Sequence, residues 1–105
     1  VNFALGLQDL RQQLRALSEL LEHHQGPMIL AGDLNTWSGQ RQTVVDDFTS
    51  KFGLNAIAFS PDLRTKVFGR ALDHIYIRGL EAQSAQVIPV TSSDHNPLRV
   101  RLAFN

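Results

Sequence analysis

A leucine repeat near the start of the chain places the strongest constraint on its fold. The leucines recur at alternating spacings of three and four residues, at Leu7, Leu10, Leu14, Leu17 and Leu21. This spacing predicts an amphipathic helix over about residues 7–24, with one apolar face. Gly26-Pro27 ends the helix, because glycine suits a left-handed cap and proline cannot continue a helix. The apolar face of such a helix has to be buried against another layer.

The rest of the chain predicts strands and one further helix. Met28–Ala31 is a continuous apolar run, which predicts a strand buried on both faces. A second helix is expected over about residues 40–52, where Val44, Val45, Phe48 and Phe52 share a face and Gly53 can act as the cap. A short strand near Ala56–Phe59, a turn at Ser60-Pro61-Asp62, and three strands follow, at Asp73–Ile77, Ala85–Val90 and Leu98–Phe104. This order predicts an α/β (α+β) fold with a mixed β-sheet and its helices on one face.

Composition limits the class of protein. The 105 residues suffice for one domain, the ten basic and ten acidic side chains cancel, and there is no cysteine. Disulfide frameworks, thiolate metal sites and a cysteine nucleophile are therefore excluded. No apolar run is long enough to span a bilayer. The chain starts at Val1 and shows no signal peptide, so we expect an excised fragment or a processed chain, with a cytoplasmic location.

Three short motifs carry acidic residues where strands meet loops. They are Gly32-Asp33-Leu34-Asn35, Leu72-Asp73-His74-Ile75 and Ser93-Asp94-His95-Asn96-Pro97. Together they supply hard oxygen ligands for Mg²⁺ or Mn²⁺, a base, and an amide that can donate to developing charge. That inventory indicates metal-assisted cleavage of a phosphoester.

The first motif has two interpretations. Asp33 is expected to orient an attacking water or to hold Mg²⁺, and the amide of Asn35 to donate to a phosphoryl oxygen. Alternatively, Asp33 and Asn35 form an Asx turn and bond their own backbone.

The other two motifs also leave alternatives open. Asp73 is expected to accept a hydrogen bond from a ring nitrogen of His95; the alternative is a strand-edge carboxylate solvated by water. Adjacent residues in extended chain point in opposite directions, so Asp94 is expected to face the metal while His95 faces the phosphate. A polar loop that caps the last strand is the alternative for that motif. We interpret His74 as a half-exposed strand residue rather than a ligand.

Three further side chains are candidates for substrate binding. Trp37 could stack on a base or sugar, or close a minor core. Arg64 and Arg70, together with Lys66, form a basic segment that could contact phosphate oxygens; a solvated surface loop is the alternative.

In this order, the three motifs resemble the C-terminal half of the endonuclease/exonuclease/phosphatase (DNase I-like) superfamily. The resemblance covers essentially residues 1–105. The opening Val1-Asn2-Phe3, the Gly-Asp-x-Asn-x-Trp-Ser run and Phe-Gly-Arg-x-Leu-Asp resemble the bacterial YafD-type (UPF0294) subgroup most closely. The resemblance implies half of a four-layer α/β sandwich, within a metal-dependent phosphodiesterase, nuclease or phosphatase that cleaves by in-line attack of water.

The resemblance also implies roles for individual residues. Asp33 would orient or deprotonate the water, Asn35 would stabilise the transition state, Asp94 would lie in the metal environment, His95 would contact the scissile phosphate, and Asp73 would hold His95. In this superfamily a metal-binding Glu, an Asn and a further His come from the N-terminal half, and those motifs are not found here. We therefore expect the fragment alone to be inactive.

The expected partners follow from the same resemblance. They are a phosphoester substrate, with nucleic acid as one candidate, and the N-terminal half of the domain. A half sandwich leaves an apolar sheet face in water, at roughly 25 cal/mol per Å², which favours a homodimer through that face. A non-catalytic binding or oligomerisation module that retains the fold is the alternative function.

Overall fold

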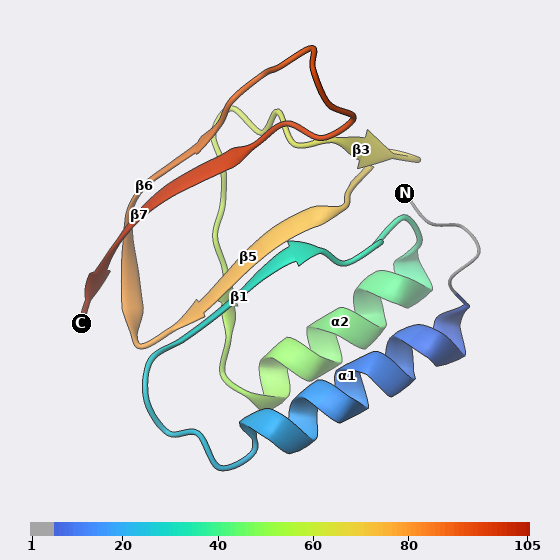
Figure 1. The fold of residues 1–105 in the computed structure, drawn as a ribbon, viewed down its shortest axis with the longest axis vertical. Coiled ribbons are helices and arrows are strands. Elements are labelled where there is room, and N and C mark those ends of the chain that lie inside the picture. Colours follow the sequence, from blue (N-terminus) through green and yellow to red (C-terminus); the bar gives the residue numbers. More distant parts are fainter. Residues whose placement is uncertain (1–5) are drawn as a thin grey trace.

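Two helices lie side by side on one face of a small sheet in the computed structural model, which describes residues 6–105 (Figure 1). Helix α1 (Leu7–Leu21) begins where the Gly6 backbone N–H donates to the Asp9 carboxylate at 3.2 Å. It contains the leucine repeat and ends three residues before the expected position. Helix α2 (Gly39–Lys51) begins at Ser38, whose hydroxyl accepts from the Arg41 N–H at 3.3 Å. The Val1-Asn2-Phe3 segment lies outside the described residues.

The strands form three antiparallel groups. Strand β5 (Asp73–Arg78) pairs with β1 (Met28–Asp33) on one side and with β2 (Asn55–Ala56) on the other. Strands β6 (Leu80–Val87) and β7 (Leu98–Phe104) form a long hairpin, with an irregularity between Ala82 and Ser84. The two helices and these sheets confirm the α/β (α+β) class, and each recorded strand pair is antiparallel.

A short hairpin forms within the basic segment, for which a solvated surface loop was the alternative. It consists of β3 (Lys66–Val67) and β4 (Arg70–Ala71), joined by Phe68 and Gly69. Both turn residues have positive φ, 54° and 76°, which is the backbone that a tight hairpin turn requires. Strands of two residues are too short to show alternation in a sequence.

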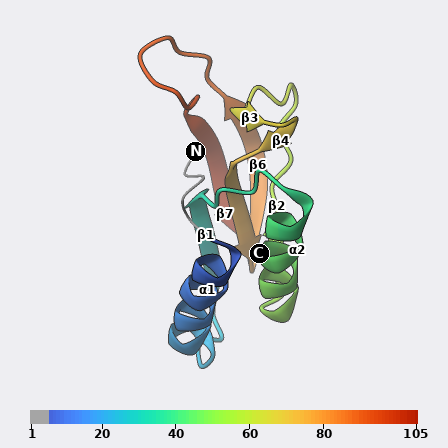
Figure 2. The ribbon, with the colours of Figure 1, turned by 90° about the vertical axis from the view of Figure 1, so that its right-hand side faces the viewer.

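Strand β5 separates two apolar clusters. On one face, Tyr76 packs with the helices, in a cluster that includes Leu10, Leu14, Met28, Val45, Phe48, Phe52 and Leu54. On the other face, Ile77 packs against the β6–β7 hairpin, in a cluster that includes Ile57, Phe59 and Val87. The molecule therefore has three layers: the helices, the central sheet, and the hairpin (Figure 1); in Figure 2 the helices lie toward the viewer, with the hairpin behind them.

The expected burial of the first strand on both faces is wrong. Met28 is buried toward the helices, but Ile29, which points the other way, is 55% exposed. The β6–β7 hairpin covers β5 and the segment after β2, and none of the residues in that cluster belongs to β1. An open apolar groove of about 370 Å³ remains beside β1, lined by Pro27, Met28, Ile29, Leu80, Leu102, Ala103 and Phe104.

Two strand boundaries also differ from expectation. Strand β2 is shorter than the predicted Ala56–Phe59, and β6 starts at Leu80 and ends at Val87 rather than covering Ala85–Val90. None of the helices in residues 6–105 has the length and apolar character to cross a membrane.

Candidate functional site

Two carboxylates face each other at one end of the β1–β5 ladder. In the antiparallel register Asp33, the last residue of β1, lies opposite Asp73, the first residue of β5. Residues directly opposite in such a ladder have Cβ atoms roughly 4.5–5.5 Å apart. The register alone therefore brings together two acidic residues that are distant in the sequence.

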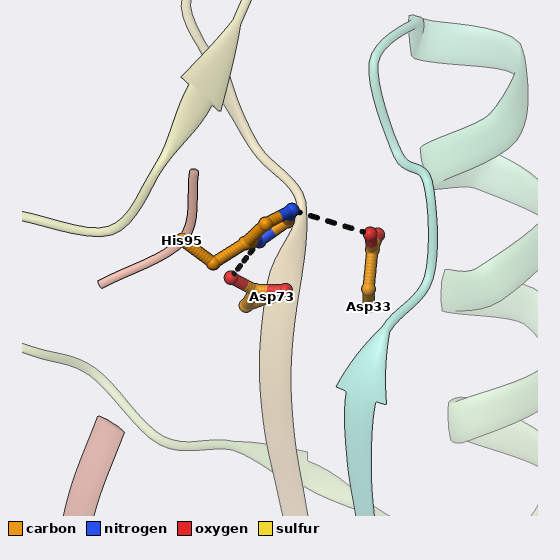
Figure 3. Close-up of side chains that lie close together, drawn as sticks. All are labelled: Asp33, Asp73 and His95. Carbon is orange, nitrogen blue, oxygen red and sulfur yellow. Dashed lines mark hydrogen bonds and ion pairs between the residues drawn. The ribbon is translucent and has the colours of Figure 1, made fainter. Parts of the chain in front are cut away.

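His95 lies between these carboxylates. Its Nδ1 lies 2.6 Å from Asp73 Oδ2, and its Nε2 lies 3.7 Å from Asp33 Oδ2 (Figure 3). The carboxylate accepts the hydrogen bond, so Nδ1 carries the proton and Nε2 is directed toward Asp33. The hydrogen bond between Asp73 and His95 expected from the sequence is present in the structure. The Asp73 side chain is 14% exposed, whereas those of His95 and Asp33 are 31% and 35% exposed.

The backbone after β1 is bent by two unusual residues. Gly32 has φ 147° and Asn35 has φ 51°, values that favour glycine and asparagine respectively. The Asn35 N–H donates to Asp33 Oδ1 at 2.8 Å, which is the hydrogen bond of an Asx turn. Because only Oδ1 is used, Oδ2 remains directed at His95. The turn and the site are thus compatible.

Arg41 supports this bend and was not identified from the sequence. Its Nε donates to the Asn35 carbonyl at 2.7 Å, and its guanidinium lies 5.4 Å from the centre of the Trp37 ring. The side chain is nearly inaccessible although it belongs to the first turn of α2. An arginine at the start of a helix is ordinarily expected at the surface. Its position in the sequence therefore does not indicate that it supports the bend after β1.

The loop that carries His95 is held by the side chain of Thr65 and by its own Asn96, which bonds the backbone of two other residues. Thr65 Oγ1 donates to the Asp94 carbonyl at 2.9 Å and accepts from the Asn96 N–H at 3.3 Å. Asn96 in turn donates to the Leu63 carbonyl at 2.7 Å and accepts from the Val90 N–H at 3.1 Å. These contacts fix the backbone on both sides of His95. Thr65 was missed because a lone threonine in a loop has no distinctive pattern.

Asp94 does not join the other acidic residues. It is exposed, and the group able to hold a metal comprises Asp33, Asp73 and His95, with ligand atoms within 4.8 Å of one another. Because Asp73 Oδ2 already accepts from His95, Asp33 Oδ2 and His95 Nε2 are the atoms directed toward each other and available to a ligand. A carboxylate and an imidazole suit a divalent cation, and Mg²⁺ commonly retains several waters. The residues present therefore fit a partly hydrated ion.

A hollow of about 470 Å³ adjoins this group. It is lined by Ala31, Gly32, Asp73, His74, Ile75, Val90, Ser92, Ser93, His95, Asn96, Pro97 and Leu98. One wall is apolar, from β1, β5 and the start of β7, and the other is the polar loop that bears His95. A ligand in the hollow would meet the imidazole at its edge.

Arg64 lies behind the site rather than in solvent. It forms a two-pronged ion pair with Asp62, in which Nε and Nη2 each lie 2.8 Å from a carboxylate oxygen. Its Nη1 donates to the Asp73 carbonyl at 3.0 Å. Hydrogen bonds from Arg64 lower the pKa of Asp62 to about 2, and the Asp62 carboxylate raises the pKa of Arg64. The structure thus brings Arg64 to the backbone of the site.

The other predicted substrate residues lie on a neighbouring surface. Arg70 is exposed on β4, and its guanidinium lies against Gly39 at the start of α2. Lys66 Nζ donates to the Asp62 carbonyl at 3.3 Å. Trp37 is half-buried and makes an edge contact with Phe68, with ring centres 6.2 Å apart. Because Phe68 is 76% exposed, this contact lies at the surface, and stacking of Trp37 on a base or sugar stays a prediction.

His74 is buried, which corrects the half-exposed interpretation. It lies on the face of β5 that the helices cover, and its ring stacks on Tyr76 with centres 5.6 Å apart. Burial, assisted by the positive charge of Arg64, lowers the pKa of His74. Its Nε2 lies 2.6 Å from the hydroxyl of Thr36, a fully buried residue that sequence reasoning did not single out.

Comparison with known sequences agrees with the motifs. Residues 2–95 match the sequence profile of the Endonuclease/Exonuclease/phosphatase family. Similar curated proteins include UPF0294 proteins of Erwinia tasmaniensis, 45% identical over 100 residues, of Yersinia enterocolitica, 44% identical over 100 residues, and of Vibrio vulnificus, 46% identical over 101 residues. Each match covers 95% of this chain.

The relatives are considerably longer than this chain, which spans 36–38% of their length. No solved structure matches significantly. The match to the family profile and to the UPF0294 proteins confirms the resemblance drawn from the three motifs: the chain belongs to the endonuclease/exonuclease/phosphatase family.

Proposed function

We propose that the chain forms part of a metal-dependent phosphoester hydrolase that cleaves by in-line attack of water. Its family is named for endonucleases, exonucleases and phosphatases, all of which cleave phosphoesters. The observation that carries the proposal is the position of His95, hydrogen-bonded to Asp73 at 2.6 Å and facing Asp33 at 3.7 Å. This arrangement holds an imidazole nitrogen and a free carboxylate oxygen beside an open hollow.

The geometry supports a different chemical role for each of these residues. Asp73 accepts from Nδ1–H and orients His95, so that the doubly protonated imidazolium can donate from Nε2–H to a phosphate oxygen. Asp33 Oδ2 accepts a proton as the water oxygen forms its bond to phosphorus. The opposite ester P–O bond breaks, the departing oxygen takes a proton from solvent water, and Asp33 releases its proton to solvent. Asn35, held beside Asp33 by the turn, is assigned to stabilise charge on the phosphoryl oxygens.

A divalent cation, Mg²⁺ or Mn²⁺, would be held by Asp33 and by water, because both ions favour oxygen ligands, and would supply charge neutralisation at the phosphoryl oxygens. The role of Asp94 as a metal group stays a prediction, and so do the roles of Arg64, Arg70 and Trp37 as substrate groups; of these four, Asp94 and Arg70 are exposed. Because the relatives are about two and a half times as long, we assign the complete activity to a longer protein that contains this chain. A cytoplasmic location likewise stays a prediction.

The test is hydrolysis of a generic phosphodiester, bis(4-nitrophenyl) phosphate, by this chain and by the longer gene product that contains it. We expect turnover by the longer protein with Mg²⁺ or Mn²⁺, loss of turnover with EDTA, and little or none from the chain alone. Asp33→Ala should reduce kcat by at least about 100-fold, because it removes both the proton acceptor and a metal ligand.

Asp47→Ala provides the matched control, since Asp47 is an exposed aspartate on α2 outside the group. It should leave kcat unchanged. Metal-independent turnover, or turnover that Asp33→Ala leaves intact, would contradict the proposal. A parallel assay with 4-nitrophenyl phosphate distinguishes phosphomonoesterase from phosphodiesterase activity.

One observation favours a second candidate, a binding or oligomerisation module. The apolar groove beside β1 is open, and Phe104 on its rim is 80% exposed. A surface of this kind suits a protein partner, either the N-terminal part of a longer protein or a second copy of the chain. Tight association that survives Asp33→Ala and His95→Ala would favour this function.

A further inference from the structure

A buried polar pair connects the two segments that carry the site. Thr36 follows Asn35 at the exit from β1, and His74 follows Asp73 on β5. Thr36 is 0% exposed and His74 is 9% exposed. The mechanism proposed above uses neither side chain. Burying a hydroxyl and an imidazole is costly unless both form hydrogen bonds, so their partners are informative.

The direction of each hydrogen bond follows from the donors available. The Ala71 carbonyl can only accept, so the Thr36 hydroxyl donates to it, at 2.7 Å. A hydroxyl has one proton, and it is used in this bond. The 2.6 Å contact between Thr36 Oγ1 and His74 Nε2 must therefore have Nε2–H as the donor.

Arg64 contacts the other nitrogen of the His74 ring. Its Nη1 lies 3.5 Å from His74 Nδ1 and can only donate, so Nδ1 is the acceptor. The same Nη1 donates to the Asp73 carbonyl at 3.0 Å, and Asp62 holds the guanidinium from behind. The imidazole of His74 is thereby restricted to one tautomer, with the proton on Nε2.

These hydrogen bonds connect the chain after β1 to β5 beyond the end of the β1–β5 ladder. The β1–β5 register ends at the Asp33–Asp73 pair, and after it the chain turns through Asn35 with φ 51°. From there the Leu34 N–H donates to the Leu72 carbonyl at 3.0 Å, and the Thr36 side chain reaches Ala71 and His74. The turn that orients Asp33 and Asn35 is thus attached on its far side to the strand that bears Asp73.

We infer that Thr36 and His74 are positioning residues, whose hydrogen bond fixes Asp33 and Asn35 relative to the Asp73–His95 pair. They act through the site residues and do not contact substrate. The expected effect on kcat rests on the proposed function. The hydrogen bond and its effect on the Asx turn can be tested without that function. A mere filler of the core would need the shape of Thr36 but not its hydroxyl.

The first test is the tautomer of His74 in this chain. A long-range ¹H–¹⁵N correlation spectrum distinguishes protonated from unprotonated imidazole nitrogens. We expect the proton on Nε2 and none on Nδ1. A proton on Nδ1 alone would overturn the inference, because Thr36 would then lack its donor. This measurement needs neither metal nor activity.

The second test compares Thr36→Val, which keeps the shape, with Thr36→Ser, which keeps the hydroxyl. Thr36→Val should shift the Asn35 amide resonance, whereas Thr36→Ser should leave it close to wild type. In the protein that shows metal-dependent turnover, we expect Thr36→Val to lower kcat by about 10–100-fold with KM changed less than about threefold, because small displacements of reacting groups are costly. Thr36→Ser should restore kcat to within about threefold.

His74→Gln and His74→Leu form an independent pair. The glutamine amide can place an N–H near the position of Nε2, whereas leucine cannot donate, so His74→Gln should retain more of the kcat. Equal kcat and an unmoved Asn35 amide in Thr36→Val would overturn the inference even if that variant is less stable. If the wild-type longer protein shows no metal-dependent turnover, the proposed function fails, and the spectra of this chain still decide whether the hydrogen bond between Thr36 and His74 exists.

Discussion

Asp62 shows how one ion pair couples the site to pH. Its pKa is lowered from 3.8 to about 2 by hydrogen bonds from Arg64, and Arg64 holds the Asp73 carbonyl. The folded state therefore resists protonation of this carboxylate more than the unfolded state does. The resulting stabilisation is fully present above about pH 4 and is lost as the pH falls toward 2.

We therefore predict that Asp62→Asn lowers the free energy of unfolding near neutral pH and flattens its decline between pH 4 and pH 2. The effect should be about 1 kcal/mol, because the carboxylate is partly exposed and solvent screens the pair. Urea unfolding at a series of pH values measures it. Asp47→Asn serves as the control, and the same acid dependence in wild type and Asp62→Asn would contradict the prediction.

The site residues differ in how far the sequence could reveal them. Asp73 and His95 were paired correctly because each stands in a short motif with a recognisable chemistry. Thr36 and Arg41 were missed, since a threonine in a turn and an arginine at a helix start are ordinary there. Their roles depend on the Ala71 and Asn35 carbonyls that they reach, and no local pattern specifies those distances.

Arg78 connects elements that are otherwise separate. It ends β5, and its guanidinium donates to the Phe52 carbonyl at 2.9 Å and to the His24 and Gly26 carbonyls at 3.0 Å each. These carbonyls belong to the chain just after α2 and after α1. One cation thus satisfies acceptors beyond the C-terminal ends of both helices, where partial negative charge accumulates.

Replacing this side chain tests that role. Arg78→Met removes the donors but retains most of the aliphatic stem, and we predict a loss of about 2–3 kcal/mol in the free energy of unfolding. Arg101→Met on β7 is the matched control, because Arg101 is exposed, and it should change stability by less than about 0.5 kcal/mol. Urea denaturation of both variants measures the difference. A loss no larger for Arg78→Met than for the control would contradict this role.

At the level of elements, periodicity predicted burial correctly only where it depends on a single neighbouring layer. The leucine repeat gave α1 and the face of α2 was correct, because each helix buries a single stripe. Burial of a strand depends on both neighbouring layers. Ile29 and His74 were therefore misjudged in opposite directions, one left uncovered by the hairpin and the other covered by the helices.

At the scale of the whole molecule, the groove beside β1 is an exposed apolar surface between strands of different sheets. Ile29 is 55% and Phe104 is 80% exposed, on strands from different sheets. Burying two such side chains contributes roughly 1.5–3 kcal/mol each, which corresponds to about tenfold or more in a dissociation constant per residue. The exposure of these side chains depends on how the layers pack together, which no single sequence motif specifies.

We predict that this chain self-associates through the groove. Sedimentation velocity should show a concentration-dependent dimer, and the double variant Ile29→Lys/Phe104→Lys should weaken it by at least about 100-fold. Leu20→Lys is the control, because Leu20 is 79% exposed on α1, away from the groove. A wild-type chain that stays monomeric at high concentration would contradict the prediction.

The central position of β5 has a consequence for the order in which the chain can fold. Strand β1 precedes its partner residues Asp73–Arg78 in the chain, and α2 and the short strands β2, β3 and β4 lie between them. Closing so long a loop costs conformational entropy before the stabilising contacts form. A large mean sequence separation between contacting residues therefore slows folding. Strand β1 therefore has no partner until β5 docks beside it, and only then do the two acidic residues of the site meet.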